Sequence, residues 1–342
     1  MKDLRNYSLL NHNTFGIDAK CRRFIEFSSV GELLTLCGKL TATDQPLLLL
    51  GGGSNLLLTA DFEGTVLHSA IKGVEKVVDE GDSVLVRAGS GETWDDFVAF
   101  CVEQGWHGAE NLSLIPGEVG ASAVQNIGAY GVEAKDLIEC VEVVEIATGR
   151  RATLENAECG YGYRQSRFKQ DWRGRYAITH VIYRLSTEFV PQLEYGNLRQ
   201  SLNAEASPTG GGLVGASVVR QAIIDIRREK LPDPKILGNG GSFFVNPVVA
   251  QEKYRELAAK FPGMPHYEVD SARVKIPAGW LIEQCGWKGR SLGRAGVYEK
   301  QALVLVNRGG ASGQEIVSLC KAIQDDVYGK FGIKIQTEVN II

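Results

Sequence analysis

The sequence lacks the patterns that mark several common classes of protein. Its seven cysteines are widely scattered with no Cys-x-x-Cys pair, and its five histidines form no His-x-x-x-His or Cys-His group. A disulfide framework or a zinc site needs cysteines and histidines in paired spacing. We therefore expect reduced, mostly buried thiols and no metal.

Long apolar runs and basic clusters are missing as well. The first residues contain no apolar run of a signal peptide, and no window reaches the roughly 18 apolar residues of a membrane span. The formal net charge is −4, and Lys and Arg do not cluster as in nucleic-acid-binding proteins. We expect a cytoplasmic monomer with no nucleic-acid or membrane partner. The 342 residues have room for roughly two or three domains.

Two glycine-rich segments stand out among the residues that are present. The apolar run from Pro46 to Leu50 breaks into Gly-Gly-Gly-Ser-Asn at 51–55. Residues 115–131 are mostly small, with almost no charge and no hydrophobic periodicity of a core helix. Glycine is needed where backbone approaches a partner closely or takes positive φ. Two strand-end loops whose N–H groups converge suit a phosphate-bearing cofactor.

The same segments are also compatible with tight turns in a glycine-rich β protein. No Gly-Lys-Ser/Thr follows either of them, which argues against a nucleotide-hydrolysing P-loop. A third segment, Gly210–Gly215, formally matches Gly-x-Gly-x-x-Gly. It follows a loop composition rather than a strand, so we interpret it as the lead-in to a helix over 218–228.

Local patterns predict the remaining elements. Apolar runs predict strands at 47–50, 65–68, 84–87 and 177–185, and Gly149 predicts a hairpin between 141–148 and 151–154. Helical spacing begins at Trp94, and a capping box at Ser312 and Glu315 predicts a helix that ends near Gly329. Strict alternation predicts a last strand over 333–341.

Two further sites carry residues that could perform chemistry. Tyr163-Arg164 lies in an aromatic and cationic run, where an arginine suits a substrate carboxylate but is also common in surface packing. Ser242 lies between a glycine run and two phenylalanines, which fits either a turn before a strand or a hydroxyl in a protected pocket. It lacks the Gly-x-Ser-x-Gly pattern of hydrolases, so it would act as a proton donor rather than a nucleophile.

The pattern Gly-x-Gly-Ser-Asn at 51–55, followed by Ile-Pro-Gly and Gln-Asn-Ile-Gly-Ala-Tyr-Gly, resembles the flavin-binding signature of the bacterial UDP-N-acetylenolpyruvoylglucosamine reductase family. The resemblance runs from Asn13 to Glu338. It implies FAD as cofactor and NADPH as hydride donor. The positions that it assigns to FAD are Gly51, Gly52, Gly53, Ser54, Asn55, Pro116, Gly117, Ser122, Gln125, Asn126, Gly128, Ala129, Tyr130 and Gly131.

The resemblance also implies roles for the other candidates. Arg164 and Glu338 would bind and polarise the substrate carboxylate, Ser242 would donate a proton, and Tyr163 would accompany the arginine. The positions that it assigns to the UDP-sugar are Tyr195, Lys230, Asn246, Tyr267, Lys288 and Gln301. The Tyr195 segment and the Tyr267 loop are features of the longer subtype of the family.

The implied fold class is α+β, with a two-part FAD-binding domain of the vanillyl-alcohol oxidase and p-cresol methylhydroxylase type. We place this domain at 1–231, split near 70–75 and completed by the strand 332–342, and a UDP-sugar domain at 232–331. The implied reaction is NADPH-dependent reduction of UDP-N-acetylglucosamine enolpyruvate for peptidoglycan synthesis. Two alternatives remain: an FAD-dependent oxidase of a sugar lactone or hydroxy acid, and a non-catalytic nucleotide-sugar-binding protein.

Overall fold

The computed structural model describes residues 1–194, 198–205 and 214–342. The chain forms two compact units. Unit 1 comprises residues 1–7, 21–52 and 63–229, and unit 2 comprises residues 8–20, 53–62 and 230–342. The expected glycine loop at 51–55 is therefore divided between the units, after Gly52.

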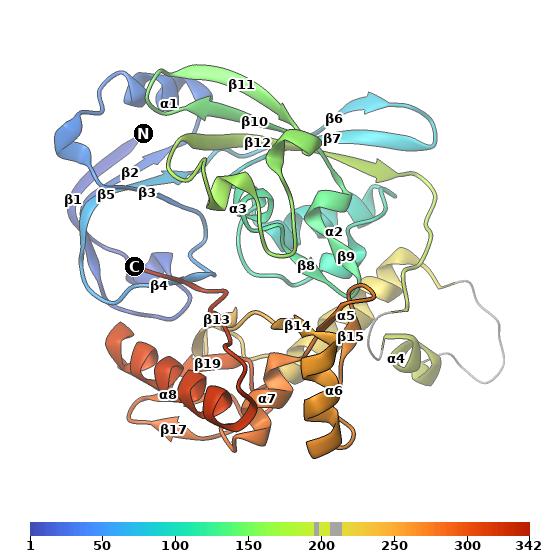
Figure 1. The fold of residues 1–342 in the computed structure, drawn as a ribbon. Coiled ribbons are helices and arrows are strands. Elements are labelled where there is room, and N and C mark those ends of the chain that lie inside the picture. Colours follow the sequence, from blue (N-terminus) through green and yellow to red (C-terminus); the bar gives the residue numbers. More distant parts are fainter. Residues whose placement is uncertain (195–197, 206–213) are drawn as a thin grey trace. The chain divides into compact units, whose positions relative to one another are not determined.

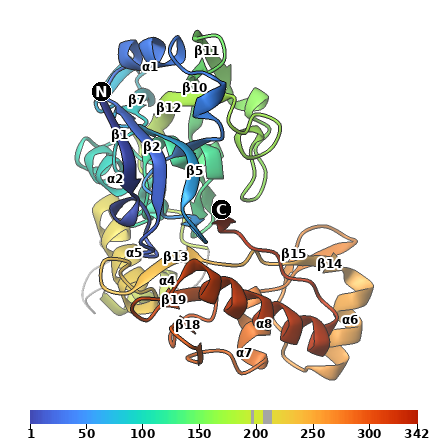
Figure 2. The same ribbon diagram turned by 90° about the vertical axis from the view of Figure 1, so that its left-hand side faces the viewer.

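Unit 1 begins with a four-stranded sheet, which Figure 2 shows with β1, β2 and β5 side by side. The strand order is β1 (Lys2–Ser8), β2 (Lys20–Phe27), β5 (Phe62–Ser69) and β3 (Leu47–Leu50). Strands β3 and β5 are parallel, with Leu50 opposite His68. Helix α1 (Val30–Cys37) buries Leu33 and Leu36 in the core of this sheet, because both lie on its apolar face.

The second sheet of unit 1 has five strands (Figure 1). Its order is β11 (Arg150–Glu155), β10 (Ile138–Glu145), β12 (Tyr176–Ser186), β7 (Ser83–Gly89) and β6 (Val74–Asp79). Neighbouring strands in this order pair antiparallel. The pairing of β10 with β11 confirms the predicted hairpin across Gly149. The chain passes from the first sheet to the second between Ser69 and Val74. The split of the cofactor domain near 70–75 stays a prediction.

Helices α2 (Trp94–Glu103) and α3 (Val119–Gln125) pack on the five-stranded sheet, where Trp94, Val119 and Ala123 enter a core with strand residues. The prediction that 115–131 contains no core helix was wrong for α3. Its buried positions include Gly120, where an added Cβ would lie 2.8 Å from the Ser90 side chain. Small residues bury this helix by close approach, which a search for large apolar residues cannot detect.

Strands β8 (Gly128–Ala129) and β9 (Val132–Glu133) form a short hairpin after α3. Helices α4 (Leu198–Glu205) and α5 (Ala216–Lys230) complete unit 1. The predicted helix at 218–228 is confirmed, and it ends before Pro232 as prolines in this position require. Tyr195 and most of the Gly210–Gly215 segment lie outside the described residues.

Unit 2 is built on a four-stranded sheet with the order β13 (Gly238–Ser242), β19 (Val304–Asn307), β18 (Ala295–Val297) and β17 (Ser291–Leu292). Helix α8 (Gly313–Phe331) begins at the predicted capping box and ends at Gly332, whose φ is 65°, rather than near Gly329. The smaller elements are α6 (Gln251–Lys260), α7 (Ala278–Gln284), β14 (Val248–Ala250), β16 (Arg273–Lys275) and β15 (Tyr267–Glu268).

The C-terminal segment differs from the expected long strand. Only β20 (Asn340–Ile341) is a strand, and it pairs parallel with β4 (Leu56–Leu57) in unit 2. The alternation of apolar residues still buries Ile333, Ile335 and Val339. By their contacts, residues 332–342 belong to unit 2, as β4 does. That they complete the cofactor domain stays a prediction.

Candidate functional site

The two predicted glycine segments meet in unit 1. A Cβ added at Gly51 would lie 3.1 Å from the Ala121 Cβ, and one added at Gly52 would lie 3.3 Å from the Gly117 Cα. Bare backbone from both segments therefore shares one small region. Backbone of this kind can approach a phosphate group closely, so the arrangement fits a cofactor that carries phosphates.

The second segment is fixed by backbone hydrogen bonds to the start of α2. The Trp94 N–H donates to the Gly117 carbonyl at 3.0 Å, and the Val119 N–H donates to the Glu92 carbonyl at 2.9 Å. Pro116, which is exposed, precedes Gly117, whose φ is 126°. Glycine suits this backbone conformation, and the segment is held in one place before any ligand binds.

Several predicted cofactor residues use their side chains to hold the scaffold. The Ser122 hydroxyl is buried and bonds to the Tyr183 hydroxyl at 2.8 Å. The Asn126 amide donates to the Gly162 carbonyl at 2.8 Å and accepts from the Lys135 N–H at 3.0 Å. The side chains of Ser122 and Asn126 thus stabilise the loop through contacts within the protein. Any contact that these two residues make with a cofactor would involve their backbone atoms.

The turn after α3 has a strained backbone. Asn126 and Tyr130 have φ values of 47° and 48°, and Gly131 has a φ of 85°. Gly128 pairs with Glu133 and Ala129 pairs with Val132, so Tyr130-Gly131 forms a two-residue hairpin turn with positive φ at both positions. Gln125 accepts a hydrogen bond from the Lys169 ammonium at 2.7 Å.

Arg164 lies against this same turn. Its guanidinium donates to the Asn126 carbonyl at 3.3 Å and to the Gly128 carbonyl at 2.5 Å. Its own φ is 56°, a conformation that non-glycine residues adopt rarely and often at functional sites. The neighbouring Tyr163 ring is 39% exposed, with its centroid 5.2 Å from the Arg164 Cζ. The structure therefore joins two predicted groups, the cofactor loop and the Tyr163-Arg164 pair.

A half-buried arginine that the sequence analysis missed lies in the same unit. The Arg227 Nε of α5 is buried and finds no hydrogen-bond partner in the part of the chain that the structure describes. Burial lowers the pKa of Arg227, and Tyr130, Asp95 and Arg164 are its charged or titratable neighbours. The Asp95 carboxylate is bonded to Arg220 at 2.6 Å. A buried cation requires an anion, and here a bound ligand would supply one.

A signal for Arg227 was present in the helical spacing. Arg220 and Arg227 are seven residues apart, so they lie on one side of α5 beside buried Ile223 and Ile226. Charged residues that border an apolar stripe at this spacing are candidates for buried ion pairs or ligand contacts. The bare backbone of Gly51, Gly52 and Gly117, which we call the glycine cradle, and the Arg227 Nε without a partner among the described residues together fit an anionic, phosphate-bearing cofactor in unit 1.

Ser242 and Glu338 lie close together in unit 2. The Glu338 N–H donates to the carbonyl of Phe243 at 2.8 Å, and the Val245 N–H donates to the Gln336 carbonyl at 2.9 Å. Phe243 and Phe244 are buried, whereas Ser242 at the end of β13 is exposed. The ladder between β13 and β19 is irregular between Asn239 and Ser242. Such bulges re-aim side chains next to functional sites.

The rest of the first glycine loop belongs to unit 2. The Asn55 carbonyl accepts from the Asn340 N–H at 3.2 Å, and its amide donates to the Glu338 carbonyl at 3.4 Å. Asn55 thus connects to the Glu338 segment. Gly53 packs on residues 12–14, since a Cβ there would lie 2.0 Å from the His12 carbonyl oxygen, and Ser54 beside it is half-buried.

Apart from Tyr195, which lies outside the described residues, the predicted UDP-sugar residues are dispersed over the surface and turns of unit 2. The Asn246 side-chain oxygen accepts from the Ala278 N–H at 2.9 Å, and that of Gln301 accepts from the Leu303 N–H at 3.3 Å. Lys288 pairs with Glu283 at 3.0 Å. Lys230 and Tyr267 are exposed. The two amide oxygens thus have structural partners, while Lys230 and Tyr267 are accessible.

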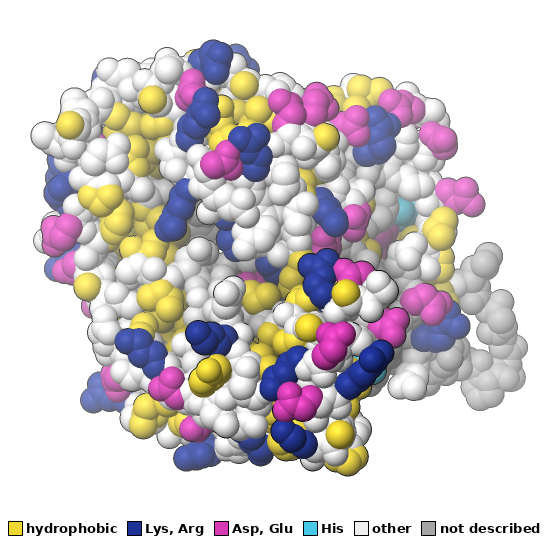
Figure 3. Space-filling model, in the orientation of Figure 1, with side chains coloured by type: hydrophobic (Ala, Val, Ile, Leu, Met, Phe, Trp, Pro, Cys, Tyr) yellow, Lys and Arg dark blue, Asp and Glu magenta, His cyan; other side chains and the backbone are white. Residues whose placement is uncertain are grey.

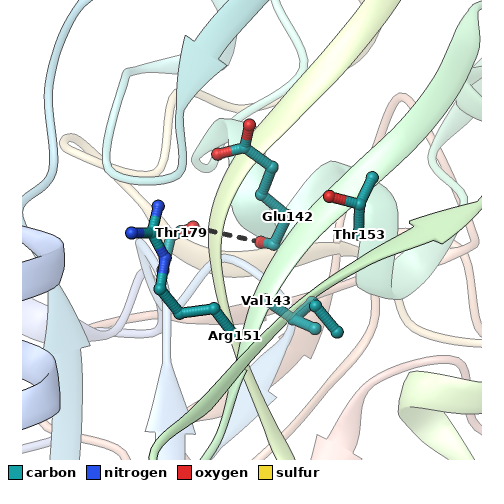
Figure 4. A pocket seen from close by; sticks show the side chains of 6 residues that line it. Glu142, Val143, Arg151, Thr153 and Thr179 are labelled. Carbon is teal, nitrogen blue, oxygen red and sulfur yellow. Dashed lines mark hydrogen bonds between the residues drawn. The ribbon is translucent and has the colours of Figure 1, made fainter.

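A polar hollow on the five-stranded sheet contains none of these residues (Figure 4). Glu142, Arg151, Thr153 and Thr179 line it, and the Thr179 hydroxyl donates to the Glu142 carbonyl at 3.2 Å. The Glu142 carboxylate is already held by Arg87 at 2.7 Å. This hollow is a feature of the sheet surface and is separate from the predicted site residues of unit 1.

The described residues contain no candidate metal cluster and no helix suited to a membrane. In residues 1–194, 198–205 and 214–342, no group of three or more His, Cys, Asp or Glu side chains is placed to hold a metal ion. Within the same ranges, no helix has the length and apolar character needed to cross a membrane. On the face in Figure 3, basic and acidic side chains are interspersed.

Comparison with known proteins supports the expectation from the motifs. The model of the FAD binding domain family matches residues 22–155, and that of the UDP-N-acetylenolpyruvoylglucosamine reductase C-terminal domain matches residues 233–342. The chain is 54% identical to a UDP-N-acetylenolpyruvoylglucosamine reductase of Bacteroides fragilis over 338 residues, 99% of each chain. Its identity to that of Flavobacterium johnsoniae is 46% over 340 residues, 98% of each chain.

A solved structure shows a similar fold. The UDP-N-acetylenolpyruvylglucosamine reductase of Thermus caldophilus matches with a TM-score of 0.67 and 22% identity, covering 99% of this chain and 98% of that chain. The predicted α+β fold with an FAD-binding domain is confirmed. On its identity to the curated relatives over nearly their whole length, the chain belongs to the UDP-N-acetylenolpyruvoylglucosamine reductase family.

Proposed function

We propose that this chain reduces UDP-N-acetylglucosamine enolpyruvate to UDP-N-acetylmuramate with electrons from NADPH, in the synthesis of peptidoglycan precursors. The relatives that carry the reductase name cover the chain almost completely. The observation that carries the chemistry is the 2.8 Å hydrogen bond between the Glu338 N–H and the Phe243 carbonyl, because it brings Glu338 next to the predicted proton donor Ser242.

FAD is the cofactor that this reaction uses. Backbone of Gly51, Gly52 and Gly117 would hold its phosphates, and the half-buried Arg227 would offset negative charge on the bound ligand. When bound, FAD supplies two-electron chemistry, in which a hydride is accepted from NADPH and delivered to the substrate. The remaining steps belong to side chains of this chain.

Arg164 binds the carboxylate of the enolpyruvyl group. Hydride addition to the methylene carbon breaks the carbon–carbon double bond and places negative charge on the adjacent carbon and its carboxylate. A guanidinium stabilises this charge as it develops, because its fork matches a carboxylate. Glu338 polarises the same carboxylate, and Tyr163 restricts the position of Arg164 through the stacked ring contact at 5.2 Å.

Ser242 completes the reaction. Its hydroxyl donates a proton to the carbon next to the carboxylate, and solvent restores that proton afterwards. A serine hydroxyl is a weak acid, but the acceptor is a carbanion and therefore a strong base. The nucleotide sugar is held by its assigned contacts, which are Tyr195, Lys230, Asn246, Tyr267, Lys288 and Gln301. We place the reaction in the cytoplasm, where the seven free cysteines would stay reduced.

Anaerobic spectroscopy tests the proposal. The purified protein should be yellow, NADPH should bleach it, and UDP-N-acetylglucosamine enolpyruvate should restore the colour in the absence of oxygen. A protein that binds the nucleotide sugar without flavin chemistry would show no bleaching. An oxidase would be reoxidised by oxygen but not by the enolpyruvyl sugar, and either result would overturn the proposal.

A further inference from the structure

His68 lies between two carboxylates in unit 1, beside the glycine cradle. Its Nδ1 is 3.2 Å from Glu26 Oε2, and its Nε2 is 3.1 Å from Glu118 Oε1. The His68 side chain is only 12% exposed. A neutral imidazole has one N–H donor, whereas the imidazolium has two. Two carboxylate partners on opposite ring nitrogens therefore favour the charged ring.

The electrostatic surroundings agree with this geometry. Burial disfavours the charged ring, but the hydrogen bonds and charges of Glu118 and Glu26 outweigh burial, so the pKa of His68 is raised. The groups that face the ring include Glu26 on β2, Glu118 before α3 and the Phe24 ring at 6.0 Å. Glu26 also pairs with Lys2 of β1 at 2.6 Å.

Glu118 brings a negative charge to the place where phosphates are expected. It follows Gly117 in the second glycine segment, and its Oε2 lies 3.3 Å from the position of a Cβ on Gly51. In the β3–β5 ladder, His68 lies opposite Leu50, and Leu50 directly precedes Gly51. His68 on β5 thus lies beside β3, which leads into Gly51, and also contacts the 115–131 segment through Glu118. Without a cation beside it, the Glu118 carboxylate would repel a phosphate group at Gly51 and Gly52.

We propose that the His68 imidazolium is a positioning residue for FAD, which holds Glu118 and cancels its charge beside the two glycines. The inference rests on the proposed function, since it requires that FAD binds at this cradle. When His68 loses its proton, Glu26 keeps its ion pair with Lys2, whereas Glu118 loses the cationic partner that His68 provided. FAD binding is therefore linked to one proton on His68.

The sign of the linkage follows from the direction of the pKa. Affinity for FAD is highest at low pH, where His68 is charged in both the free and the loaded protein. It falls as pH rises between the pKa of His68 without FAD and its higher pKa with FAD, by at most about tenfold for each pH unit, and then levels off. Cytoplasmic pH lies close to the range in which histidines titrate.

The experiment is the release of FAD from the diluted holoenzyme, followed by FAD fluorescence from about pH 6 to about pH 9. The wild type should release more FAD as pH rises. Glu118→Gln should retain FAD at every pH without a slope, because no charge is left to cancel. His68→Gln should release about tenfold more FAD at low pH, and the double variant with Glu118→Gln should restore retention.

A matched control is His180→Gln, since His180 also lies beside a carboxylate, Glu142 at 3.1 Å, but on the five-stranded sheet. It should keep the wild-type slope. A flat wild-type profile, or a slope that persists in Glu118→Gln, would overturn the inference while leaving the FAD chemistry intact. If the wild type binds no FAD at any pH, the proposed function itself fails. Glu118→Gln keeps the inference testable even if His68→Gln does not fold.

Discussion

Gly53 shows how strongly a single position can depend on glycine. Its φ is 64°, and an added Cβ would lie 2.0 Å from the His12 carbonyl oxygen and 2.8 Å from the Asn13 Cα. These are backbone atoms, and moving them away from the added Cβ would cost free energy. We predict that Gly53→Ala lowers the free energy of unfolding by at least about 3 kcal/mol, even without cofactor.

Thermal unfolding of the flavin-free protein measures this effect. Gly52→Ala is the matched variant, because its Cβ would lie 3.3 Å from the Gly117 Cα. It should unfold at nearly the wild-type temperature but retain less FAD. Equal melting temperatures for Gly53→Ala and wild type would contradict the close approach at residue 53.

In the proposed mechanism, Ser242 acts only in the second half of the reaction, when the enolpyruvyl sugar reoxidises the reduced flavin. Ser242→Ala should leave the reduction of FAD by NADPH at near-normal rate, because it changes neither the residues proposed to bind FAD nor Arg164, the residue proposed to bind the carboxylate. Reoxidation by the enolpyruvyl sugar should slow by about 10²–10⁴, the usual loss for a general acid. Stopped-flow absorbance separates the two steps.

Ser242→Cys is the informative companion variant. A thiol is a stronger acid of similar size, so it should keep more activity than alanine if proton donation is the role. If alanine and wild type reoxidise at the same rate, Ser242 is only a turn residue at the end of β13.

Arg227 allows stability and ligand binding to be separated. Arg227→Met removes a half-buried cation whose buried Nε has no partner in the described part of the chain, so the flavin-free protein should be as stable as wild type or more stable. Retention of FAD should fall by at least about tenfold, because the ligand loses its counter-charge.

Arg228→Met is the control, since Arg228 is the next residue on α5 and is exposed. It should change neither property. A variant of Arg227 that unfolds at lower temperature but binds FAD normally would show that the arginine serves the fold instead.

At the scale of elements, one ion pair attaches α5 to α2. Asp95 in the first turn of α2 bonds to Arg220 at 2.6 Å and accepts the Leu114 N–H at 2.6 Å. Burial alone would raise the pKa of Asp95, but the bonds from Arg220 and Leu114 outweigh burial and lower it. The pair therefore stabilises the fold above the pKa of an unfolded aspartate, about 4, and this contribution is lost as pH falls through the lower, folded pKa.

We predict that Asp95→Asn loses about 1–3 kcal/mol of stability at neutral pH. It should also lose less additional stability than wild type between about pH 4 and about pH 2. Urea unfolding at several pH values measures both effects. Asp171→Asn is the control, because Asp171 pairs with Arg167 at 2.5 Å with a half-exposed side chain, and surface pairs contribute about 0–1 kcal/mol. Similar losses for both variants would contradict the role of the α2–α5 pair.

At the scale of the whole molecule, the chain crosses between its two units repeatedly. The crossings follow Tyr7, Lys20, Gly52, Phe62 and Glu229. The packing of unit 2 depends on its early segments, residues 8–20 and 53–62, because Asn307 donates to the Phe15 carbonyl at 2.9 Å and β20 pairs with β4. A Cβ at Gly313 would lie 1.9 Å from the Leu58 carbonyl oxygen, so α8 also begins against that piece.

We predict that residues 230–342 alone do not fold, although they contain the matched C-terminal domain. The fragment would expose the surfaces that residues 8–20 and 53–62 cover. Circular dichroism and thermal unfolding of the fragment should show no cooperative transition, with the full chain as control. Cooperative unfolding of the isolated fragment would disprove the dependence on the early segments.

The sequence by itself determined the elements whose formation depends only on residues that are close together along the chain. The strands at Leu47–Leu50 and Ser83–Gly89, the hairpin at Gly149, and the helix starts at Trp94 and Gly313 follow from apolar spacing, turn residues and a capping box. These signals act within a few residues, so they can be read without a structure. The glycine motifs likewise identified the family, because their order along the chain is specific.

Only the tertiary structure decided which distant residues share a place. It divided the 51–55 loop after Gly52, paired β20 with β4 in unit 2, and buried α3 through glycine contacts that carry no apolar signal. It also placed His68 against Glu118 and left the Arg227 Nε buried near Arg164. Such contacts join residues tens of positions apart, and a side chain's burial and charge partners exist only after those segments have packed.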